Sequence, residues 1–253
     1  MREIPTLQGD RQLFEKYTEE DSQVWKLLFE RQEEQLERFA SHTYLDGLVR
    51  IGFHANAIPS FDRINAVLSE STGWEIVAVP GIVDDKKFFE LMAEKKFPAT
   101  TWLRRMEEID YLEEPDMFHD VFAHVPLLAD QHFADFLHAL SQISLKYIDN
   151  PVAIELLSRV YWYTVEFGLI RENGQLRIYG AGILSSVGET RHSMGLKPMR
   201  FEFNPEQLLN SPYRKDVFQD RYFIIDSFEQ LYSSIDDISA MLEEQLKKST
   251  MFA

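Results

Sequence analysis

The chain has 253 residues, a formal net charge of −16 and no cysteine. This length fits one large domain with a substantial core, and the acidic balance argues against a nucleic-acid or anionic-membrane surface. Without cysteine, disulfides, catalytic thiols, zinc–thiolate sites and iron–sulfur clusters are excluded, so any metal must be held by nitrogen and oxygen ligands.

The first third of the chain is predicted to be helical after a polar start. We expect residues 1–20 to form an arm on the surface. The spacing of apolar residues predicts helices over residues 20–39 and 45–51. A further helix is predicted over residues 61–68, with Ser60 as its N-terminal cap and Pro59 marking its entry.

The middle of the chain combines one strand with several helices. Residues 74–81 alternate, are rich in β-branched side chains and end in Pro-Gly, which predicts a strand followed by a turn. Apolar periodicity then predicts helices over residues 84–94, 101–107, 132–148 and 151–169.

The last third closes the predicted fold. Asn173-Gly174 interrupts the pattern before a short strand at residues 176–179, and residues 236–248 form an amphipathic helix. Neither an internal repeat nor a flexible linker is visible. The sequence therefore predicts a mainly α fold with small β elements (α+β) in a single domain over residues 1–253, with a C-terminal helix and tail over residues 236–253.

Two histidines stand five residues apart in the otherwise apolar run 115–126. Five residues turn an α-helix by about 500°, so His119 and His124 do not share one face of a regular helix. To reach one metal ion they need a helix end or a distortion, and Pro126 marks the end of the segment. A single histidine on an apolar face is a core residue about four times more often than a ligand, so spacing alone leaves both interpretations open.

The carboxylate of Glu166 lies in a second apolar run, residues 161–168. Burying an ionised carboxylate among aromatic side chains costs free energy unless a cation or hydrogen bonds compensate. Arg159, Arg171 or exposure to water could provide this compensation, and a metal ion is the alternative. Together with His119 and His124, Glu166 predicts the two-histidine, one-carboxylate arrangement of non-haem iron(II) oxygenases, which leaves coordination positions open.

Other candidate motifs are incomplete. The segment Tyr179-Gly180-Ala181-Gly182 has Ser185 in place of the third glycine of a dinucleotide-binding loop. Glu189 and His192 form a single E-x-x-H pair, whereas a di-iron bundle needs two. The H-E-x-x-H motif of zinc proteases is absent.

Three blocks of sequence, residues 114–128, 161–169 and 179–186, resemble the pterin-dependent aromatic amino acid hydroxylases, in particular their bacterial members. The blocks occur in the order and at the separation found in that family, and weaker similarity runs from about residue 15 to residue 232. The resemblance implies a catalytic domain of the aromatic amino acid hydroxylase type. The activity that it implies is hydroxylation of L-phenylalanine to L-tyrosine with O₂, Fe(II) and a tetrahydropterin, either tetrahydrobiopterin or a bacterial tetrahydropterin.

The resemblance also implies roles for individual residues. It implies that His119, His124 and Glu166 hold Fe(II), in agreement with the interpretation from the residues alone. It assigns the substrate carboxylate to Arg104, whose planar guanidinium suits bidentate binding. The implied remainder of the substrate pocket consists of Pro115, Trp162, Phe167 and Ser185.

The implied pterin site involves Gly81, Ile82, Val83, Phe88 and Asp120. Phe88 would stack on the pterin ring, the backbone of residues 81–83 would bond to the pterin edge, and Asp120 would reach it through water. Without the resemblance, these aromatic side chains would be interpreted as ordinary core about three times out of four. One departure from the family is Ala123, which replaces the usual glycine between the two histidines and adds a methyl group close to the site.

Two alternatives remain open. The same machinery could act on tryptophan or at the meta position of phenylalanine, or the chain could be a non-catalytic metal- or ligand-binding relative. The expected partners are small molecules only (an aromatic amino acid, O₂ and tetrahydropterin), without nucleic acid or membrane. Because the chain is as long as the family's catalytic core, we expect a monomer with neither a regulatory nor a tetramerisation domain. The N-terminus has no apolar signal segment, and a cytoplasmic location is expected.

Overall fold

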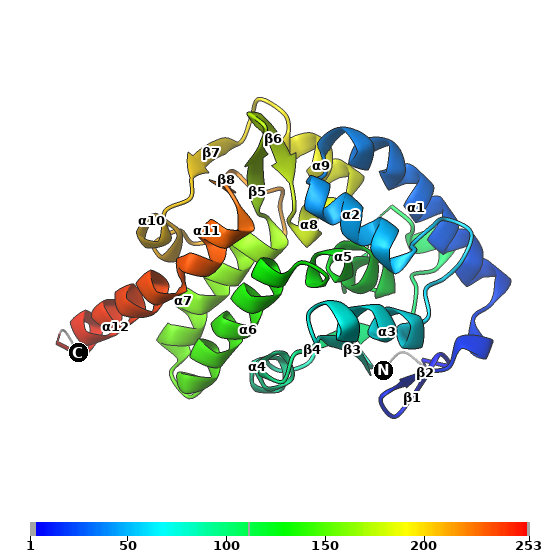
Figure 1. The fold of residues 1–253 in the computed structure, drawn as a ribbon, viewed down its shortest axis with the longest axis horizontal. Helices are drawn as coiled ribbons and strands as arrows, with labels where there is room; N and C mark the ends of the chain where they lie inside the picture. Colours follow the sequence, from blue (N-terminus) through cyan, green and yellow to red (C-terminus); the bar gives the residue numbers. More distant parts are fainter. Residues whose placement is uncertain (1–3, 111, 252–253) are drawn as a thin grey trace.

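Helices make up most of the fold in the computed structural model, which describes residues 4–110 and 112–251 (Figure 1). The α-helices are α1 (Glu19–Phe39), α2 (His42–Ile51), α3 (Phe61–Ser71), α4 (Asp85–Ala93), α5 (Val125–Leu128), α6 (Gln131–Lys146), α7 (Pro151–Tyr161), α8 (Ala181–Leu184), α9 (Val187–Ser193), α10 (Pro205–Leu209), α11 (Phe228–Ser233) and α12 (Ile235–Met251). The short 3₁₀ and π segments are η1 (Phe14–Lys16), η2 (Met106–Glu108), η3 (Phe118–Ala123) and η4 (Trp162–Glu166). The strands are β1 (Leu7–Gln8), β2 (Arg11–Gln12), β3 (Glu75–Val79), β4 (Lys96–Thr100), β5 (Leu169–Glu172), β6 (Gln175–Ile178), β7 (Met199–Glu202) and β8 (Arg221–Ile225). The predicted mainly α fold with small β elements is confirmed.

Side-chain caps explain where several of the predicted helices begin. Thr18 and Asp21 form a reciprocal capping box at the start of α1. Asp84 caps α4, and Asn150 caps α7 with Pro151 at its first position. Ser60 occupies the predicted N-cap position of α3, but its side chain makes no capping hydrogen bond, so this part of the prediction is wrong. The first backbone N–H of α3 donates instead to the Gln12 side chain at 2.9 Å.

Two predicted helices differ from the structure. Residues 101–105 form neither helix nor strand, and only the short 3₁₀ turn η2 follows. Their backbone groups pair with a distant segment rather than with each other: Met117 N donates to Trp102 O, and Arg104 N donates to the Asp116 carboxylate. The helix predicted over residues 151–169 is α-helical only to Tyr161 and continues as the π segment η4.

The strands form three small sheets. β1 and β2 form an antiparallel hairpin, and β3 pairs in parallel with β4 through the crossover helix α4. The largest sheet has the order β6-β5-β8-β7. Its β5–β6 hairpin turns at Asn173 and Gly174, both with positive φ, as a two-residue hairpin turn requires. Strands β1, β2, β4, β5, β7 and β8 were absent from the sequence-based prediction.

The N-terminal arm and the first half of α12 are tied to the body. In the predicted surface arm, Thr6 is buried and its hydroxyl lies 3.2 Å from Thr101 O, while Tyr17 donates to the same carbonyl at 2.6 Å. Helix α12 buries Ile238 and Leu242 in its first half and then extends away from the body (Figure 1). Contacts far apart in sequence therefore hold the N-terminal arm and the start of α12 in place.

An aromatic cluster holds η3 at the centre of the molecule. Phe118 and Phe122 stack on each other with ring centroids 4.4 Å apart. Trp25 of α1 meets Phe118 edge-on at 5.5 Å, and Phe29 meets Phe122 at 5.2 Å. The buried Tyr44 hydroxyl donates a 2.8 Å hydrogen bond to Phe122 O. One side of η3 is thus fixed by packing, which leaves the other side for polar residues.

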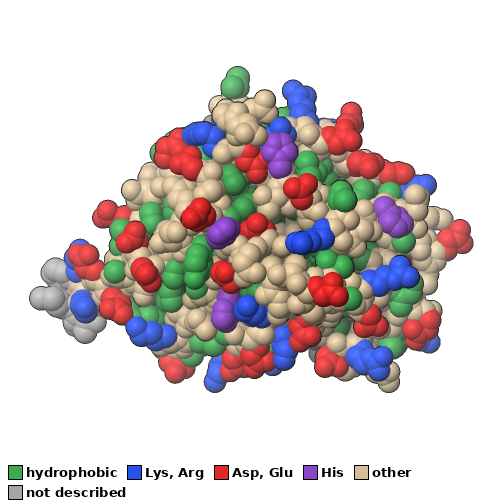
Figure 2. All heavy atoms as spheres, in the orientation of Figure 1, with side chains coloured by type: hydrophobic (Ala, Val, Ile, Leu, Met, Phe, Trp, Pro, Cys, Tyr) green, Lys and Arg blue, Asp and Glu red, His purple; other side chains and the backbone are tan. Residues whose placement is uncertain are grey.

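Charge is spread over the surface. Figure 2 shows Asp and Glu side chains scattered over the visible face and interspersed with Lys and Arg. The visible face therefore has no concentrated basic patch, in keeping with the net charge of −16. Among the described residues, none of the helices is long and apolar enough to span a membrane.

The Tyr44 hydrogen bond generates a stability prediction. Tyr44→Phe keeps the buried ring but leaves the Phe122 carbonyl without this donor, so the free energy of unfolding should fall by about 1–3 kcal/mol. Urea denaturation of the variant and the parent protein measures this difference. Tyr232→Phe, at a side chain that is 42% exposed, is the matched control and should change stability by less than about 0.5 kcal/mol. Equal effects of both substitutions would contradict the prediction.

Candidate active site

A π turn explains how His119 and His124 converge despite their five-residue spacing. His119 lies within η3 and His124 directly follows it. In a π-helix the hydrogen bonds join residues five apart, so the wider turn brings positions i and i+5 to the same side. The Nε2 atoms of the two histidines lie 3.2 Å apart. The helix distortion that the sequence required is therefore present, and Ala123 is buried in it without a positive φ.

Glu166 ends the second π segment, η4. The backbone N–H of Phe167 donates to Trp162 O across five residues, at 2.9 Å. Neither arginine that the sequence offered as a partner for Glu166 takes that role: Arg159 pairs with Glu155, and Arg171 pairs with Glu202. The Glu166 carboxylate instead faces the two histidines.

The side chains of His119, His124 and Glu166 form a compact triangle, in which each carboxylate oxygen lies near one histidine. Glu166 Oε1 lies 3.2 Å from His124 Nε2, and Glu166 Oε2 lies 3.6 Å from His119 Nε2. Nitrogen and oxygen ligands about 2.1 Å from one ion and at right angles to each other would lie about 3.0 Å apart. The triangle therefore has the size that a single divalent ion needs, and within the described chain it is the group identified as able to hold a metal ion.

The second nitrogen of His119 is held by a hydrogen bond. Its Nδ1 lies 2.9 Å from Ser185 Oγ, which also lies 2.9 Å from Ala181 O. Because the serine hydroxyl donates to that carbonyl, it accepts from Nδ1–H, and this fixes the tautomer with a free lone pair on Nε2. Ser185 thus lies beside His119 and orients the imidazole toward the triangle.

The charge states of the three residues suit a cation. Burial would raise the pKa of the Glu166 carboxyl, but His124, His119 and the backbone N–H of Gly182 lower it to about 2. Burial lowers the pKa of His119, which favours the neutral imidazole that binds metals. Metal ligation requires both imidazoles to be neutral, and the three groups would then carry one net negative charge, which a bound cation would compensate.

Glycines allow the chain to pack closely around Glu166. An added Cβ at Gly180 would overlap the backbone carbonyl of Glu166, and one at Gly168 would overlap Thr164 O and the Tyr179 ring. Only residues without a side chain fit between these backbones. The block around Gly180 that resembled a dinucleotide loop is thus a close-packing element behind the carboxylate.

Arg104 makes a bidentate ion pair with Asp116, whose side chain is fully buried. Its Nε and Nη2 donate to the two carboxylate oxygens at 2.9 and 3.0 Å. The same carboxylate accepts the backbone N–H of His119 at 3.3 Å. Arg104 therefore supports the start of the segment that carries the histidines.

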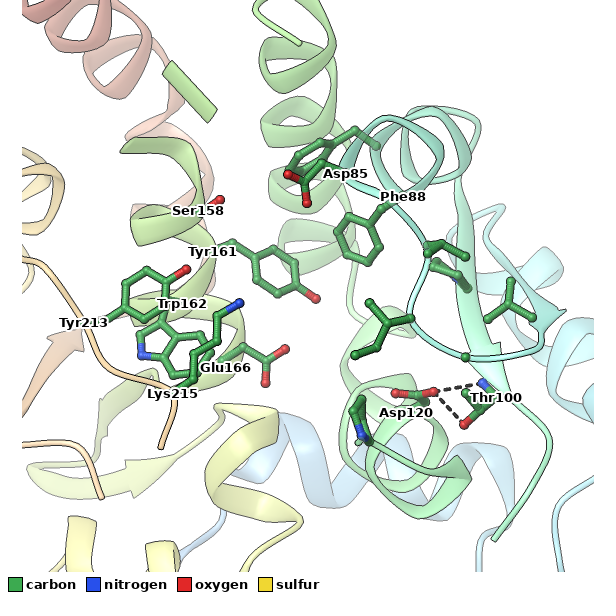
Figure 3. Close-up of a pocket in the computed structure, with 17 residues that line it drawn as sticks. Asp85, Phe88, Thr100, Asp120, Ser158, Tyr161, Trp162, Glu166, Tyr213 and Lys215 are labelled. Atoms are coloured by element: carbon green, nitrogen blue, oxygen red, sulfur yellow. Dashed lines mark hydrogen bonds between the residues drawn. The ribbon is translucent and has the colours of Figure 1, made fainter. Parts of the chain in front are cut away.

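A cavity of about 280 Å³ adjoins the triangle (Figure 3). Of the residues predicted to bind ligands, its wall includes Glu166 and also Gly81, Ile82, Val83, Phe88, Pro115, Asp120 and Trp162. The two histidines and the other predicted ligand-binding residues, Arg104, Phe167 and Ser185, are outside the described lining. Thr100 holds Asp120 with two 2.8 Å hydrogen bonds, from its backbone N–H and its hydroxyl.

The sequence-based prediction missed several residues of this wall. Tyr161 lies between Phe88 and Glu166 in Figure 3, with its hydroxyl directed into the cavity. Tyr213 stacks on Trp162 with centroids 4.4 Å apart and planes 16° apart. Lys215 follows two residues later and also lines the cavity. Tyr161 could have been found from the Tyr-Trp-Tyr run before Glu166, whereas no sequence motif marks the loop with Tyr213 and Lys215.

Comparison with known proteins agrees with this geometry. Residues 8–249 match the family described as biopterin-dependent aromatic amino acid hydroxylase. The chain is 48% identical over 220 residues to a phenylalanine-4-hydroxylase of Ralstonia nicotianae, covering 87% of this chain and 70% of the relative.

Two similar crystal structures are of phenylalanine hydroxylase from Chromobacterium violaceum. The structure with bound Fe(III) has a sequence that is 44% identical to this chain. The match covers 92% of this chain and 85% of the chain in the crystal, with a TM-score of 0.87. The structure with iron(III) and 7,8-dihydrobiopterin has a sequence that is 42% identical to this chain. The match covers 98% of this chain and 89% of the chain in the crystal, with a TM-score of 0.88. With a family match over nearly its whole length, the chain belongs to the biopterin-dependent aromatic amino acid hydroxylases.

Proposed function

We propose that the chain is a monooxygenase that hydroxylates L-phenylalanine to L-tyrosine with O₂, iron and a tetrahydropterin. The single observation that carries this proposal is the triangle of His119, His124 and Glu166 beside an aromatic-walled cavity. The similarity to phenylalanine-4-hydroxylases supports the choice of substrate. When bound, iron would activate O₂, and the tetrahydropterin would supply the two electrons that reduce one oxygen atom to water while the other enters the ring.

In this proposal, His119, His124 and Glu166 hold the iron from one side. Three protein ligands leave the remaining coordination positions for O₂ and water. Ser185 keeps His119 in the tautomer that binds through Nε2. The histidines lie in and directly after η3 and Glu166 ends η4, so the placement of η3 relative to η4 sets the size of the metal site.

The cavity divides into two sides. Figure 3 places Trp162 and Tyr213 on one side and Phe88 with Asp120 on the other, with Tyr161 and Glu166 between them. We assign the pterin to the side of Gly81–Val83 and Phe88, where a ring can stack and backbone groups are available. The substrate ring is assigned to the side of Trp162. This division would hold both rings beside the metal ligands and exclude water from the space between them.

Arg104 remains the proposed partner of the substrate carboxylate. A guanidinium has five N–H donors, and the pairing with Asp116 uses two of them. The other donors can bind a carboxylate while Asp116 keeps the plane of the guanidinium fixed. We further propose that the protein acts as a cytoplasmic monomer, which light scattering of the purified protein would test.

Removal of one ligand tests the metal site. Replacing His119, His124 or Glu166 by Ala should lower iron affinity by at least about 100-fold and abolish tyrosine formation. Elemental analysis measures the iron, and chromatography measures the product. His42→Ala, at a half-exposed histidine that pairs with Glu172, is the control and should keep both. Normal hydroxylation by an iron-free variant would sink the proposal.

Product analysis tests the substrate and the position of attack. The iron-loaded enzyme is supplied with tetrahydropterin and offered phenylalanine, tyrosine and tryptophan in separate reactions. We expect para-hydroxylated phenylalanine as the main product, identified by mass spectrometry against authentic standards. A preference for tryptophan, or a meta-hydroxylated product, would assign the same site to another reaction. No pterin-dependent oxygen consumption with any of the three would indicate a non-catalytic relative.

The double role of Arg104 generates a further prediction. Arg104→Lys keeps the charge but loses the planar fork, so the KM for phenylalanine should rise about tenfold and the free energy of unfolding should fall by about 3 kcal/mol. Steady-state kinetics and urea denaturation measure the two effects. Arg105→Lys, at the exposed neighbouring position, is the matched control. An unchanged KM together with lower stability would leave Arg104 a structural role only.

A further inference from the structure

Trp162 lines the cavity on the side assigned to the substrate ring (Figure 3). Two aromatic neighbours pack against its indole. The Tyr213 ring lies 4.4 Å away with planes 16° apart, and the Phe167 ring lies 4.6 Å away with planes 38° apart. Stacking fixes how far a ring lies from its neighbours but lets it slide and turn within its own plane. A directional contact at the edge of the indole removes that freedom.

The side chain of Gln219 makes this edge contact. Trp162 Nε1–H donates a 2.9 Å hydrogen bond to the amide oxygen of Gln219. The amide nitrogen of this buried side chain donates to Arg214 O at 2.9 Å and to Val217 O at 3.0 Å. A flipped amide would direct its N–H groups at the indole N–H and its oxygen at two carbonyls, so only this orientation satisfies all the groups. The acceptor for Trp162 is thus fixed by the other half of the same amide.

The E-x-x-H pair of α9 holds the backbone of Gln219. The Gln219 N–H donates to the Glu189 carboxylate at 3.2 Å, and Gln219 O accepts a 2.9 Å hydrogen bond from His192 Nε2. Residues three apart lie on the same side of a helix, so both side chains reach one residue. The pair that is insufficient for a di-iron site therefore has another use, because it binds both backbone polar groups of Gln219.

Glu189 and His192 are themselves held by neighbouring segments. The buried Glu189 carboxylate accepts a 2.5 Å hydrogen bond from the hydroxyl of Tyr222 in β8. The His192 ring stacks on Phe218 with centroids 5.2 Å apart and planes 23° apart. Contacts from α9 and β8 thus meet behind Gln219 and fix its position.

The effect of this network on a substrate passes through Trp162. Gln219, Glu189 and His192 are all absent from the described lining of the cavity, whereas Trp162 is part of it. An aromatic ring that lies against Trp162 must keep its reacting carbon aligned with the metal ligands, and a small displacement of the wall displaces that carbon. The orientation of the indole therefore bears on the reaction.

We propose that Gln219 is a positioning residue, whose amide oxygen fixes the orientation of the Trp162 indole against the substrate ring while Glu189 and His192 hold Gln219 from behind. The inference rests on the proposed function, because it takes Trp162 as the wall that contacts the substrate. It goes further by giving a task to a residue outside the cavity and to the E-x-x-H pair. Loss of the amide then weakens substrate binding without loss of iron.

Calorimetric titration of the iron-loaded protein with phenylalanine, without pterin and without oxygen, tests the inference. Gln219→Met keeps the length of the side chain but removes the amide. The dissociation constant for phenylalanine should rise about fivefold or more, with the iron content unchanged. In steady-state assays the KM for phenylalanine should rise in the same way, while the KM for tetrahydropterin should change by less than about twofold. A purely structural role would lower the active fraction and leave both KM values unchanged.

A double-mutant cycle assigns the effect to the indole. The Trp162→Phe variant has no N–H for Gln219 to accept, so Gln219→Met in that background should change the dissociation constant by less than about twofold. Equal weakening in both backgrounds, or no weakening in either, would rule out the proposed role of Gln219.

A second pair of variants tests the support behind Gln219. Glu189→Gln keeps an oxygen that can accept from the Tyr222 hydroxyl and the Gln219 N–H, and it should keep phenylalanine binding within about twofold. Glu189→Leu removes this oxygen and should weaken binding about threefold or more, with iron retained. The same affinity in both variants would refute this support. The comparison also decides the inference if Gln219→Met does not fold.

Gln230→Met is the matched control. The amide oxygen of Gln230 accepts the Asp226 N–H at 2.7 Å, and Gln230 is not part of the described cavity wall. This variant loses a glutamine acceptor of the same kind and should leave phenylalanine binding unchanged. If the parent protein binds phenylalanine and Gln219→Met binds it equally well, the inference alone fails. If the parent binds no aromatic amino acid, the proposed function fails with it.

Discussion

Compensation of the buried Glu166 carboxylate is the constraint on which the rest of this structure depends. An ionised carboxylate among Trp, Tyr and Phe side chains is stable only with positive charge or hydrogen-bond donors close by. Here the arginines near it in sequence pair elsewhere, and two imidazoles 3.2 and 3.6 Å away face it instead. A single cation between these three groups satisfies all of them, which links the stability of the centre to its proposed chemistry.

The chain meets this constraint with two π turns. An α-helical η3 would direct two histidines five residues apart to different sides, and the wider turn removes that difference. Such turns are costly in isolation, and here they are supported from outside. Trp25 and Phe29 pack against the rings of Phe118 and Phe122, the Tyr44 hydroxyl donates to Phe122 O, and the Asp116 carboxylate accepts the backbone N–H of His119.

The same supports connect the metal site to the ligand pocket. Arg104 holds Asp116, which holds the start of η3, so a proposed substrate ligand and the metal ligands share one buried ion pair. Trp162 begins η4, which Glu166 ends, and its indole nitrogen anchors the loop with Lys215. The loop is therefore attached to the same π segment that carries Glu166.

Much of the centre was predictable because its chemistry depends on residue type. Two imidazoles and a carboxylate in apolar runs indicate a metal site, and the three sequence blocks indicate the family, whatever the exact course of the backbone. Helices α1, α3, α4, α6 and α12 were predicted because their apolar periodicity is local. The helix predicted over residues 101–107 was wrong because its backbone bonds to Asp116 and Met117, which no local pattern reveals.

The sequence by itself determined the ligand types, the mainly helical class and the family. Only the tertiary structure decided that η3 is a π turn, that Arg104 is paired with Asp116, and that Tyr161, Tyr213 and Lys215 enter the cavity. The physical reason is the range of the interactions. Periodicity and residue chemistry act within a few residues, whereas the loop with Lys215 is placed by hydrogen bonds and ring stacking with Trp162, about 50 residues earlier in the chain.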